Sequence, residues 1–180
     1  MEIKQLKLEG TFLCTPRIFK DERGSFLESY NHKQFCIGIG RELEFVQDNH
    51  SISKKGVFRG LHFQNPPFTQ DKLVRVTKGA VLDVFLDLRK NSPTYGVCDS
   101  VKLTAESFSS LFIPAGFAHG FLALEEETHF LYKCSAYYAP SHEATIDYRT
   151  VKQLNLPSQD LILNNKDLNG EDFTSFNSPF

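Results

Sequence analysis

The sequence of 180 residues lacks tryptophan, a C-x-x-C pair and any long apolar run. No stretch approaches the ~18 consecutive apolar residues of a membrane span, and MEIKQLKLEG at the N-terminus lacks the apolar run of a signal peptide. The four cysteines, at positions 14, 36, 98 and 134, lie far apart, which is typical of reduced thiols and not of a disulfide frame or a zinc site. We therefore predict a cytoplasmic protein without a membrane partner.

The sequence also lacks a strong excess of charge of one sign and the commonest catalytic motifs. The formal net charge is -2 and no basic run stands out, which argues against a nucleic-acid partner. The sequence contains no G-x-x-x-x-G-K-[ST], no G-x-G-x-x-G after a strand and no G-x-S-x-G. These absences argue against P-loop NTPases, nicotinamide enzymes and serine hydrolases.

What the sequence does have is a series of short runs rich in Val, Ile, Phe and Tyr, separated by Gly, Pro, Asn or Ser. Such runs are typical of β-strands, and the absence of alternating long helices predicts an all-β sandwich or small closed barrel. The length suits one domain spanning residues 1–180. The strand candidates are residues 10–19, 24–31, 44–52, 56–64, 72–89, 98–104, 109–114, 119–124 and 128–138.

Local patterns predict three further features. In residues 72–89, KLVRVTKGAVLDVFLDLR, two alternating runs flank TKG and predict a β-hairpin. Helical periodicity is confined to residues 31–40 and 149–155, so we expect only a few short peripheral helices. After Ile146 the sequence becomes polar and loop-like, and the apolar LILN at 161–164 predicts that the tail from about residue 150 docks on the barrel.

Two predicted strands each carry one histidine that could belong to a metal site. In FIPAGFAHGF, residues 112–121, a P-x-G-x-x-H turn places His119 at the start of a strand, as in one half of a cupin metal site. The other half needs His-x-His with a facing Glu, whereas LHFQ at 61–64 supplies only His62. One imidazole from each half makes a poor cage, because stable sites use three or four protein ligands. We therefore expect no metal.

Two imidazoles facing one cavity remain useful for proton transfer next to a carbonyl. An imidazole with a pKa near 6.5 accepts a proton readily at neutral pH. A fixed ammonium such as Lys72 would stabilise the enolate oxygen, and Tyr132 would return the proton on the opposite face and so invert the carbon. This set requires no metal and no organic cofactor.

Each member also has a plain structural interpretation: His62 as a core histidine, Lys72 as a solvated edge residue, Tyr132 as strand packing. Asp83 and Asp87 alternate with apolar residues, which fits either a solvent-facing strand or the wall of a polar pocket.

Several phrases together resemble the dTDP-4-dehydrorhamnose 3,5-epimerase family. They are DERGSFLES, FVQDNHSISKKGVFRGLHFQ, DKLVRVTKGAVLDVFLDLRKNSPTYG, FIPAGFAHGF, LYKCSAYYAPSHEATI and LILNNKDL, and they run from about Asp21 to Leu168. The resemblance implies a cupin-type jelly roll that has lost its metal and uses no cofactor. It implies epimerisation at C3 and C5 of dTDP-4-keto-6-deoxy-D-glucose, through an enolate, to dTDP-4-keto-L-rhamnose.

The resemblance also assigns roles to individual residues. It implies that His62 is the base, Tyr132 the general acid, Lys72 the group that stabilises the enolate, and Asp167 the carboxylate that pairs with the catalytic imidazole. The implied substrate-binding residues are, near the diphosphate, Arg23, Arg59 and Lys166; near the sugar or base, Glu28, Gln47, Asp48, Asn49, His119 and Glu143; and, stacking on thymine, Tyr138.

Strand geometry and the family's assembly add two expectations. Gln47 and Asn49 share strand parity and can face one pocket, whereas Arg59 and His62 differ in parity, so their strand must twist, bulge or end between them. The family usually forms homodimers in which N-terminal strands extend the neighbour's sheet. This implies that Arg23 and Glu28 serve the partner's pocket. Departures from the family pattern are Tyr148 in place of a Trp and NNKD in the tail; the second makes Asp167 the least secure assignment.

Four other functions remain open from the sequence. The first is the same chemistry at one carbon only or on another nucleotide sugar, and the second is a 3,4-ketoisomerase. The third is a cupin that binds a nucleotide sugar without turnover, and the fourth is a metal-dependent dioxygenase or isomerase.

Overall fold

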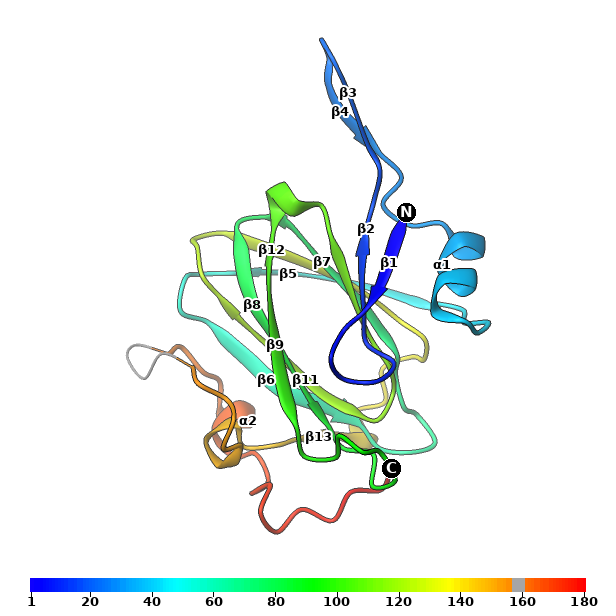
Figure 1. Ribbon diagram of the computed structural model, residues 1–180. Coiled ribbons are helices and arrows are strands. Elements are labelled where there is room, and N and C mark those ends of the chain that lie inside the picture. The colour runs from blue at the N-terminus through cyan, green and yellow to red at the C-terminus, as the bar shows by residue number, and fades with distance from the viewer. Residues whose placement is uncertain (157–160) are drawn as a thin grey trace.

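The chain forms two antiparallel β-sheets that face each other, and a separate hairpin projects from them (Figure 1). A computed structural model describes residues 1–156 and 161–180, so part of the predicted loop-like tail, residues 157–160, lies outside the described residues. The first sheet has six strands, in the order β1 (Glu2–Gln5), β2 (Phe12–Thr15), β10 (Ser110–Ile113), β7 (Lys72–Lys78), β12 (Thr128–Cys134) and β5 (Gln47–Ser53). The second has five, in the order β13 (Glu143–Thr145), β6 (Phe58–Gln64), β11 (Phe117–Ala123), β8 (Ala80–Asp87) and β9 (Cys98–Thr104). This arrangement confirms the predicted all-β sandwich.

The main core lies between the two sheets because alternate side chains of each strand point inward. Val74 on β7 and Phe130 on β12, from the first sheet, pack in one cluster with Phe85 on β8 and Phe121 on β11, from the second. The strands of the second sheet are apolar on their other face as well, since Val84 and its neighbours form another cluster there. Both faces of that sheet must therefore be covered.

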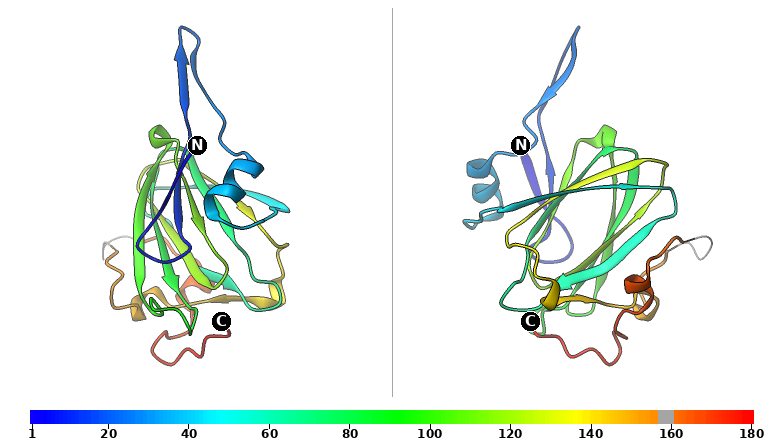
Figure 2. Two further views of the ribbon diagram at one scale, coloured as in Figure 1. Left: turned by 45° about the vertical axis from the view of Figure 1, so that its right-hand side comes forward. Right: turned by 180° about the vertical axis from the view of Figure 1, so that it is seen from behind.

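The C-terminal tail covers the outer face of the second sheet. Leu161 and Leu163 of the LILN segment pack against that face, and Phe173, Phe176 and Phe180 continue the cover to the end of the chain. Figure 2 shows the tail running around the end of the sandwich where α2 (Asn165–Leu168) lies. Docking of this tail places Lys166 and Asp167 against the sandwich.

The helices are short and peripheral. The predicted helix at residues 31–40 is confirmed as α1 (His32–Ile39), which packs Phe35 against the outer face of the first sheet. The predicted helix at 149–155 is wrong: only a 3-10 turn, η3 (Tyr148–Thr150), forms, and the Asp147 side chain caps its start. Two more such turns are η1 (Ala105–Ser107) and η2 (Pro140–His142). Within the described part of the chain, no helix is long and apolar enough to cross a membrane.

The predicted hairpin at residues 72–89 is also wrong. Both strands exist, as β7 and β8, but β7 pairs with β10 and β12 while β8 pairs with β11 and β9. Gly79, between them, has a positive φ of +77° and makes a corner that carries the chain from one sheet to the other. Two adjacent strands that read as a hairpin thus become neighbours across the sandwich.

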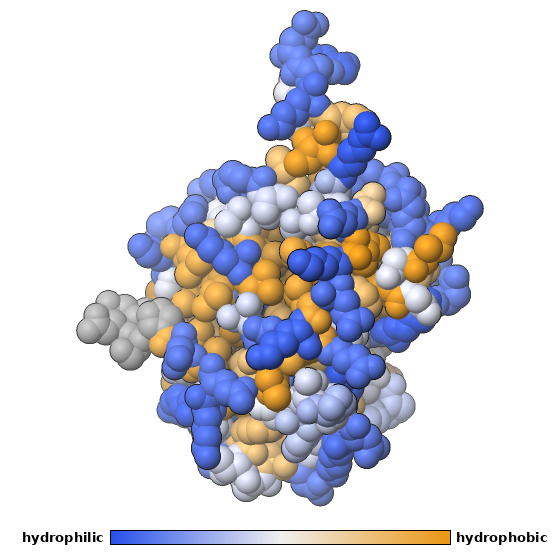
Figure 3. Space-filling view, in the orientation of Figure 1, coloured by the Kyte–Doolittle hydropathy of each residue, from blue (hydrophilic) through white to orange (hydrophobic). Residues whose placement is uncertain are grey.

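A two-stranded hairpin, β3 (Ile18–Asp21) and β4 (Gly24–Leu27), stands clear of the sandwich in every view (Figures 1 and 2). The space-filling view shows a hydrophilic tip and a hydrophobic surface nearer the body (Figure 3). Phe26 on β4 is 70% exposed and Phe19 on β3 is 49% exposed. Two large aromatic side chains on a projecting hairpin leave apolar surface uncovered within a single chain.

Candidate active site

Two adjoining cavities, of about 280 and 310 Å³, open between the sheets. Four residues line both: His62 and Glu143 from the second sheet, and Lys72 and Tyr132 from the first. The 280 Å³ cavity is also lined by Arg59, His119 and Lys166, and the 310 Å³ cavity by Gln47, Asn49 and Tyr138. The structure thus brings together most of the predicted site residues in one continuous pocket.

A β-bulge on β6 settles how Arg59 and His62 reach the same cavity. His119 on β11 pairs with His62, but Phe121, two residues further on, pairs with Arg59, three residues back. The extra residue restores common parity, so both side chains face inward while Phe58 and Leu61 face the tail. Gly60 sits in this bulge with φ +148°, and a Cβ there would lie 2.5 Å from the Cα of Gly120.

The first sheet supplies the opposite wall of the pocket, because its strand register places the relevant side chains on the same face. Lys72 on β7 lies opposite Cys134 on β12, and Tyr132, two residues away, therefore points to the same side. On the edge strand β5, Asn49 lies opposite Tyr132. Gln47 shares the parity of Asn49 as predicted, and its Nε2 donates to Asn49 Oδ1 at 3.0 Å. Ammonium and phenol thus face the imidazoles across the sandwich.

His62 is held by Asp167 of the tail. The His62 Nε2 atom donates to Asp167 Oδ1 at 2.5 Å, and the carboxylate is 1% exposed. Asn164 caps α2 by accepting from the Asp167 backbone N–H, which fixes the start of this short helix. Burial lowers the pKa of His62, although the hydrogen bond to Asp167 opposes this. A neutral imidazole with its proton on Nε2 leaves Nδ1 free to accept a proton.

Burial also shifts the pKa values of the two other candidate catalytic groups. It lowers the pKa of the Lys72 ammonium, whose Nζ donates to the His62 carbonyl at 3.3 Å. It raises the pKa of the Tyr132 phenol, which therefore keeps its proton at neutral pH and can act as a donor. A base, a protonated phenol and a cation in one cavity can remove a proton from carbon, stabilise the resulting oxyanion and return a proton.

His119 has a carboxylate partner of its own. Its Nε2 atom lies 3.0 Å from both carboxylate oxygens of Asp83, which is wholly buried on β8. From the sequence, Asp83 fitted either a solvent-facing strand or the wall of a polar pocket. The structure places Asp83 directly behind the pocket wall that His119 lines. Neither Asp83 nor Asn164 was among the predicted site residues, and no sequence motif indicates that Asp83 pairs with His119.

A further connected set of polar side chains centres on Glu143, which lines both cavities. Glu143 makes an ion pair with Lys166 and accepts a hydrogen bond from the Tyr138 hydroxyl at 2.8 Å. Burial opposes ionisation of Glu143, but these two partners outweigh it and lower its pKa. The Tyr138 backbone N–H donates to Gln47 Oε1 at 2.9 Å, which ties this loop to the edge strand. An exposed aromatic ring and a cation thus lie side by side at the cavity mouth.

Three predicted binding residues are not brought into this pocket. Arg23 lies at the tip of the projecting hairpin, where its side chain is 86% exposed and pairs with Asp21. Glu28 follows the same hairpin and accepts from Asn31. Asp48 has the opposite strand parity to Gln47 and Asn49, so it points to the outer face of the first sheet and pairs with Lys133 there.

The group of side chains that could together hold a metal ion lies outside this pocket. Among residues 1–156 and 161–180, one group of His, Cys and acidic side chains is compact enough, namely His32, Cys36 and Glu42 on α1 and the loop after it. The His32 Nε2 and Cys36 Sγ atoms lie 3.0 and 3.6 Å from the Leu43 carbonyl oxygen. These contacts tie the loop to the helix.

Comparison with known proteins agrees with this geometry. A family model described as dTDP-4-dehydrorhamnose 3,5-epimerase matches residues 5–175. The chain is 46% identical over 175 residues to the dTDP-4-dehydrorhamnose 3,5-epimerase of Shigella flexneri, covering 96% of each chain. It is 51% identical over 146 residues to that of Salmonella typhimurium, covering 81% of this chain and 80% of that one.

A solved structure extends the likeness to the whole fold. It is the dTDP-6-deoxy-D-glucose-3,5-epimerase of Legionella pneumophila in complex with dTDP-4-keto-L-rhamnose, with a TM-score of 0.93 and 39% identity, covering 98% of this chain and 94% of that one. The match confirms the predicted cupin-type fold. The chain therefore belongs to the dTDP-4-dehydrorhamnose 3,5-epimerase family, whose members are isomerases that act on carbohydrates.

Proposed function

We propose that this protein epimerises dTDP-4-keto-6-deoxy-D-glucose at C3 and C5 to give dTDP-4-keto-L-rhamnose, using only its own side chains. The observation that carries the proposal is the convergence of His62, Lys72 and Tyr132 on one cavity from opposite sheets. The family membership and the sugar nucleotide bound to the Legionella relative support the choice of substrate. C3 and C5 both flank the C4 ketone, so one base and one oxyanion site serve both carbons.

In the first half of the reaction, His62 removes the proton from the carbon. The hydrogen bond from Nε2 to Asp167 keeps the other ring nitrogen unprotonated and stabilises the imidazolium once it forms. Electrons from the broken C–H bond move onto the C4 oxygen and create an enolate. Lys72 stabilises this oxygen as an ammonium, an interaction that is stronger in the transition state than in the ground state.

In the second half, Tyr132 returns a proton to the other face of the carbon. The phenol lies on β12 and the imidazole on β6, which belong to different sheets, so a sugar between them is approached from two sides. Donation from the side opposite to abstraction inverts the stereocentre. The raised pKa of Tyr132 supports its role as a proton donor.

We assign the nucleotide to the charged and polar residues that line the two cavities around the catalytic set. Arg59 and Lys166 supply charge for the diphosphate, since charge-assisted hydrogen bonds to phosphate oxygens are strong. The exposed Tyr138 ring offers a face for thymine, and Gln47, Asn49 and Glu143 offer polar contacts around it. His119 contacts the sugar. Asp48 remains a proposed contact only by family resemblance, because in a single chain it faces away from the cavity.

We further propose a homodimer in which each hairpin completes the partner's site. The aromatic surface of β3 and β4 is uncovered, and β5 is an edge strand with one free side next to the pocket. Addition of the partner's hairpin at that edge would cover both and would carry Arg23 and Glu28 toward a substrate. A single chain would then bind its substrate incompletely.

The decisive experiment for the proposed reaction is isotope exchange. The protein is incubated with dTDP-4-keto-6-deoxyglucose in deuterium oxide, and NMR follows deuterium at C3 and C5 together with the product configuration. Label at both carbons with inversion supports the proposal. Label at C3 alone would indicate a single-carbon epimerase, and a moved carbonyl would indicate a 3,4-ketoisomerase. No incorporation by folded protein would refute the proposal.

A cytoplasmic location also stays a proposal. Cys14, Cys36, Cys98 and Cys134 are all free thiols, as expected in a reducing compartment. Fractionation of cells that produce the native protein would test the location, and recovery outside the cytoplasmic fraction would contradict it.

A further inference from the structure

Asp83 is a buried carboxylate that the reaction described above does not use. It lies on β8 with 0% exposure, between the inward-facing Val81 and Phe85 of the main core. Transfer of a carboxylate from water into such surroundings costs several kcal/mol unless the charge is compensated, and burial accordingly raises the pKa of Asp83. A buried charge of this kind needs a reason to be there.

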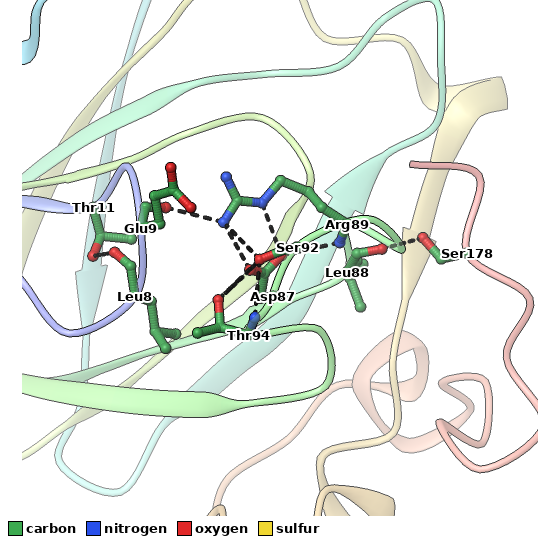
Figure 4. Close-up of polar contacts among 9 residues, drawn as sticks. All are labelled: Leu8, Glu9, Thr11, Asp87, Leu88, Arg89, Ser92, Thr94 and Ser178. Atoms are coloured by element: carbon green, nitrogen blue, oxygen red, sulfur yellow. Dashed lines mark hydrogen bonds and ion pairs between the residues drawn. The ribbon is translucent and has the colours of Figure 1, made fainter.

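A second buried aspartate on the same strand shows what a purely structural carboxylate looks like. Asp87 accepts hydrogen bonds from Arg89, Ser92 and Thr94 and so ties the loop after β8 together (Figure 4). Arg89 also donates to the Glu9 carbonyl, which ties this loop to the one between β1 and β2. Asp83, in contrast, has a single hydrogen-bond partner among the described residues, the Nε2 atom of His119.

The position of His119 fixes what this contact does. His119 on β11 lines the 280 Å³ cavity and lies opposite His62 on the neighbouring strand. Acceptance of the Nε2 proton by Asp83 holds the imidazole in one orientation and one tautomer, as an outer carboxylate does for a metal-bound or catalytic histidine. The Nδ1 atom is then the nitrogen available to a ligand.

We propose that Asp83 is a positioning residue that fixes His119 toward the sugar. This inference rests on the proposed function, because it assigns the effect to the same enolate-forming site. The two facing histidines of the second sheet then each have an aspartate partner, with Asp167 of the tail serving the base and Asp83 of β8 serving His119.

The test compares Asp83→Asn with Asp87→Asn, the matched loss of a buried carboxylate on the same strand. Deuterium wash-in is measured across the pH range for both variants and for the unmodified protein. Asp83→Asn should lower the rate about 10–100-fold, as loss of an outer-sphere partner commonly does. Affinity for dTDP should not change.

Asp87→Asn should lower thermal stability but leave the pH profile of the folded enzyme unchanged. A folded Asp83→Asn protein that keeps the original rate would overturn the inference while the proposed function stands. If the unmodified protein gives no wash-in, the proposed function fails instead.

A measurement on the unmodified protein covers the case in which Asp83→Asn does not fold. NMR of protein labelled with ¹⁵N-histidine, with the His119 signals identified from a His119→Gln sample, reports which ring nitrogen carries the proton. We expect the proton on Nε2. A proton on Nδ1 with a bare Nε2 would overturn the role of Asp83.

Discussion

The Nε2 atom of His62 lies 2.5 Å from Oδ1 of Asp167, although the two residues are 105 positions apart in the chain. His62 comes from β6 of the second sheet and Asp167 from the short helix of the docked tail. The other oxygen of Asp167, Oδ2, is buried without a hydrogen-bond partner among the described residues. The side-chain carboxylate is thus dedicated to one imidazole, so docking of the tail is part of building the base.

Asp167→Asn should therefore slow deuterium wash-in at C3 and C5 more than it weakens binding. Asparagine keeps the size of the side chain but removes the charge that stabilises the imidazolium, so we expect a loss of ~10²–10⁴ in rate. Initial rates by NMR, with the dTDP affinity by calorimetry, check this. Asp172→Asn, which alters only the cap of Thr174 in the same tail, should keep the original rate. Equal rates for both variants would contradict the pairing.

Tyr132→Phe should separate exchange from inversion. The variant keeps the ring that packs against Phe130 but loses the phenolic proton. His62 can still abstract and return a proton on its own face, so we expect deuterium to enter the substrate while the inverted product falls sharply. NMR of recovered substrate and product distinguishes the two. Tyr137→Phe, at an exposed tyrosine outside the cavity, is the control. Undiminished inversion by Tyr132→Phe would remove the phenol from the mechanism.

The rate of wash-in should depend on pH in a bell shape. Burial lowers the pKa of His62 from its ordinary 6.5, so the base form dominates at neutral pH and activity falls only as the pH drops below that value. Burial also lowers the pKa of Lys72 from its ordinary 10.5, so the alkaline limb should appear below that pH, where the ammonium is lost. A profile of kcat/KM against pH measures both limbs. An acid limb above pH 6.5 would mean that Asp167 outweighs burial.

Much of the fold follows from local patterns in the sequence. The strands are visible because side chains alternate between core and surface, and β9 matches the predicted residues 98–104. The pairing of strands is not local, which is why β7 and β8 were predicted as a hairpin. Whether a run such as TKG makes a tight turn or a corner between sheets depends on partners elsewhere, here β10 and β12 for one strand and β11 and β9 for the other.

The residues of the site also fall into those that the sequence predicts and those that depend on the folded structure. His62, Lys72 and Tyr132 were predictable as a chemically coherent set, and family resemblance added Asp167. Asp83 could not be assigned from sequence, because an alternating strand does not say which face is covered. The parity conflict between Arg59 and His62 was visible, but its solution depends on the close approach of β6 to Gly120 on β11.

Gly60→Ala should therefore damage both stability and activity. A Cβ at Gly60 would overlap backbone of the neighbouring strand, which costs about 1–3 kcal/mol of unfolding free energy beyond backbone strain. Gly24→Ala is a matched control, since Gly24 also has a positive φ, +124°, but its Cβ would meet no atom within 4 Å. Chemical denaturation measures the difference. Equal destabilisation by both substitutions would show that strain alone, and not the close approach, matters at the bulge.

Arg23→Ala and His62→Ala should be inactive or impaired alone but complement each other when mixed as subunits. If the hairpin of one chain completes the partner's site, a hybrid dimer contains one site with both a functional His62 and a functional Arg23. Random mixing of equal amounts makes half of the dimers hybrid, so on the order of a quarter of the sites should recover. Co-expression with two different affinity tags isolates the hybrid, and deuterium wash-in measures it. If Arg23 instead acts within its own chain, every site of the hybrid lacks one residue, and mixing restores nothing. A monomeric protein in sedimentation that still exchanges deuterium would contradict the shared site directly.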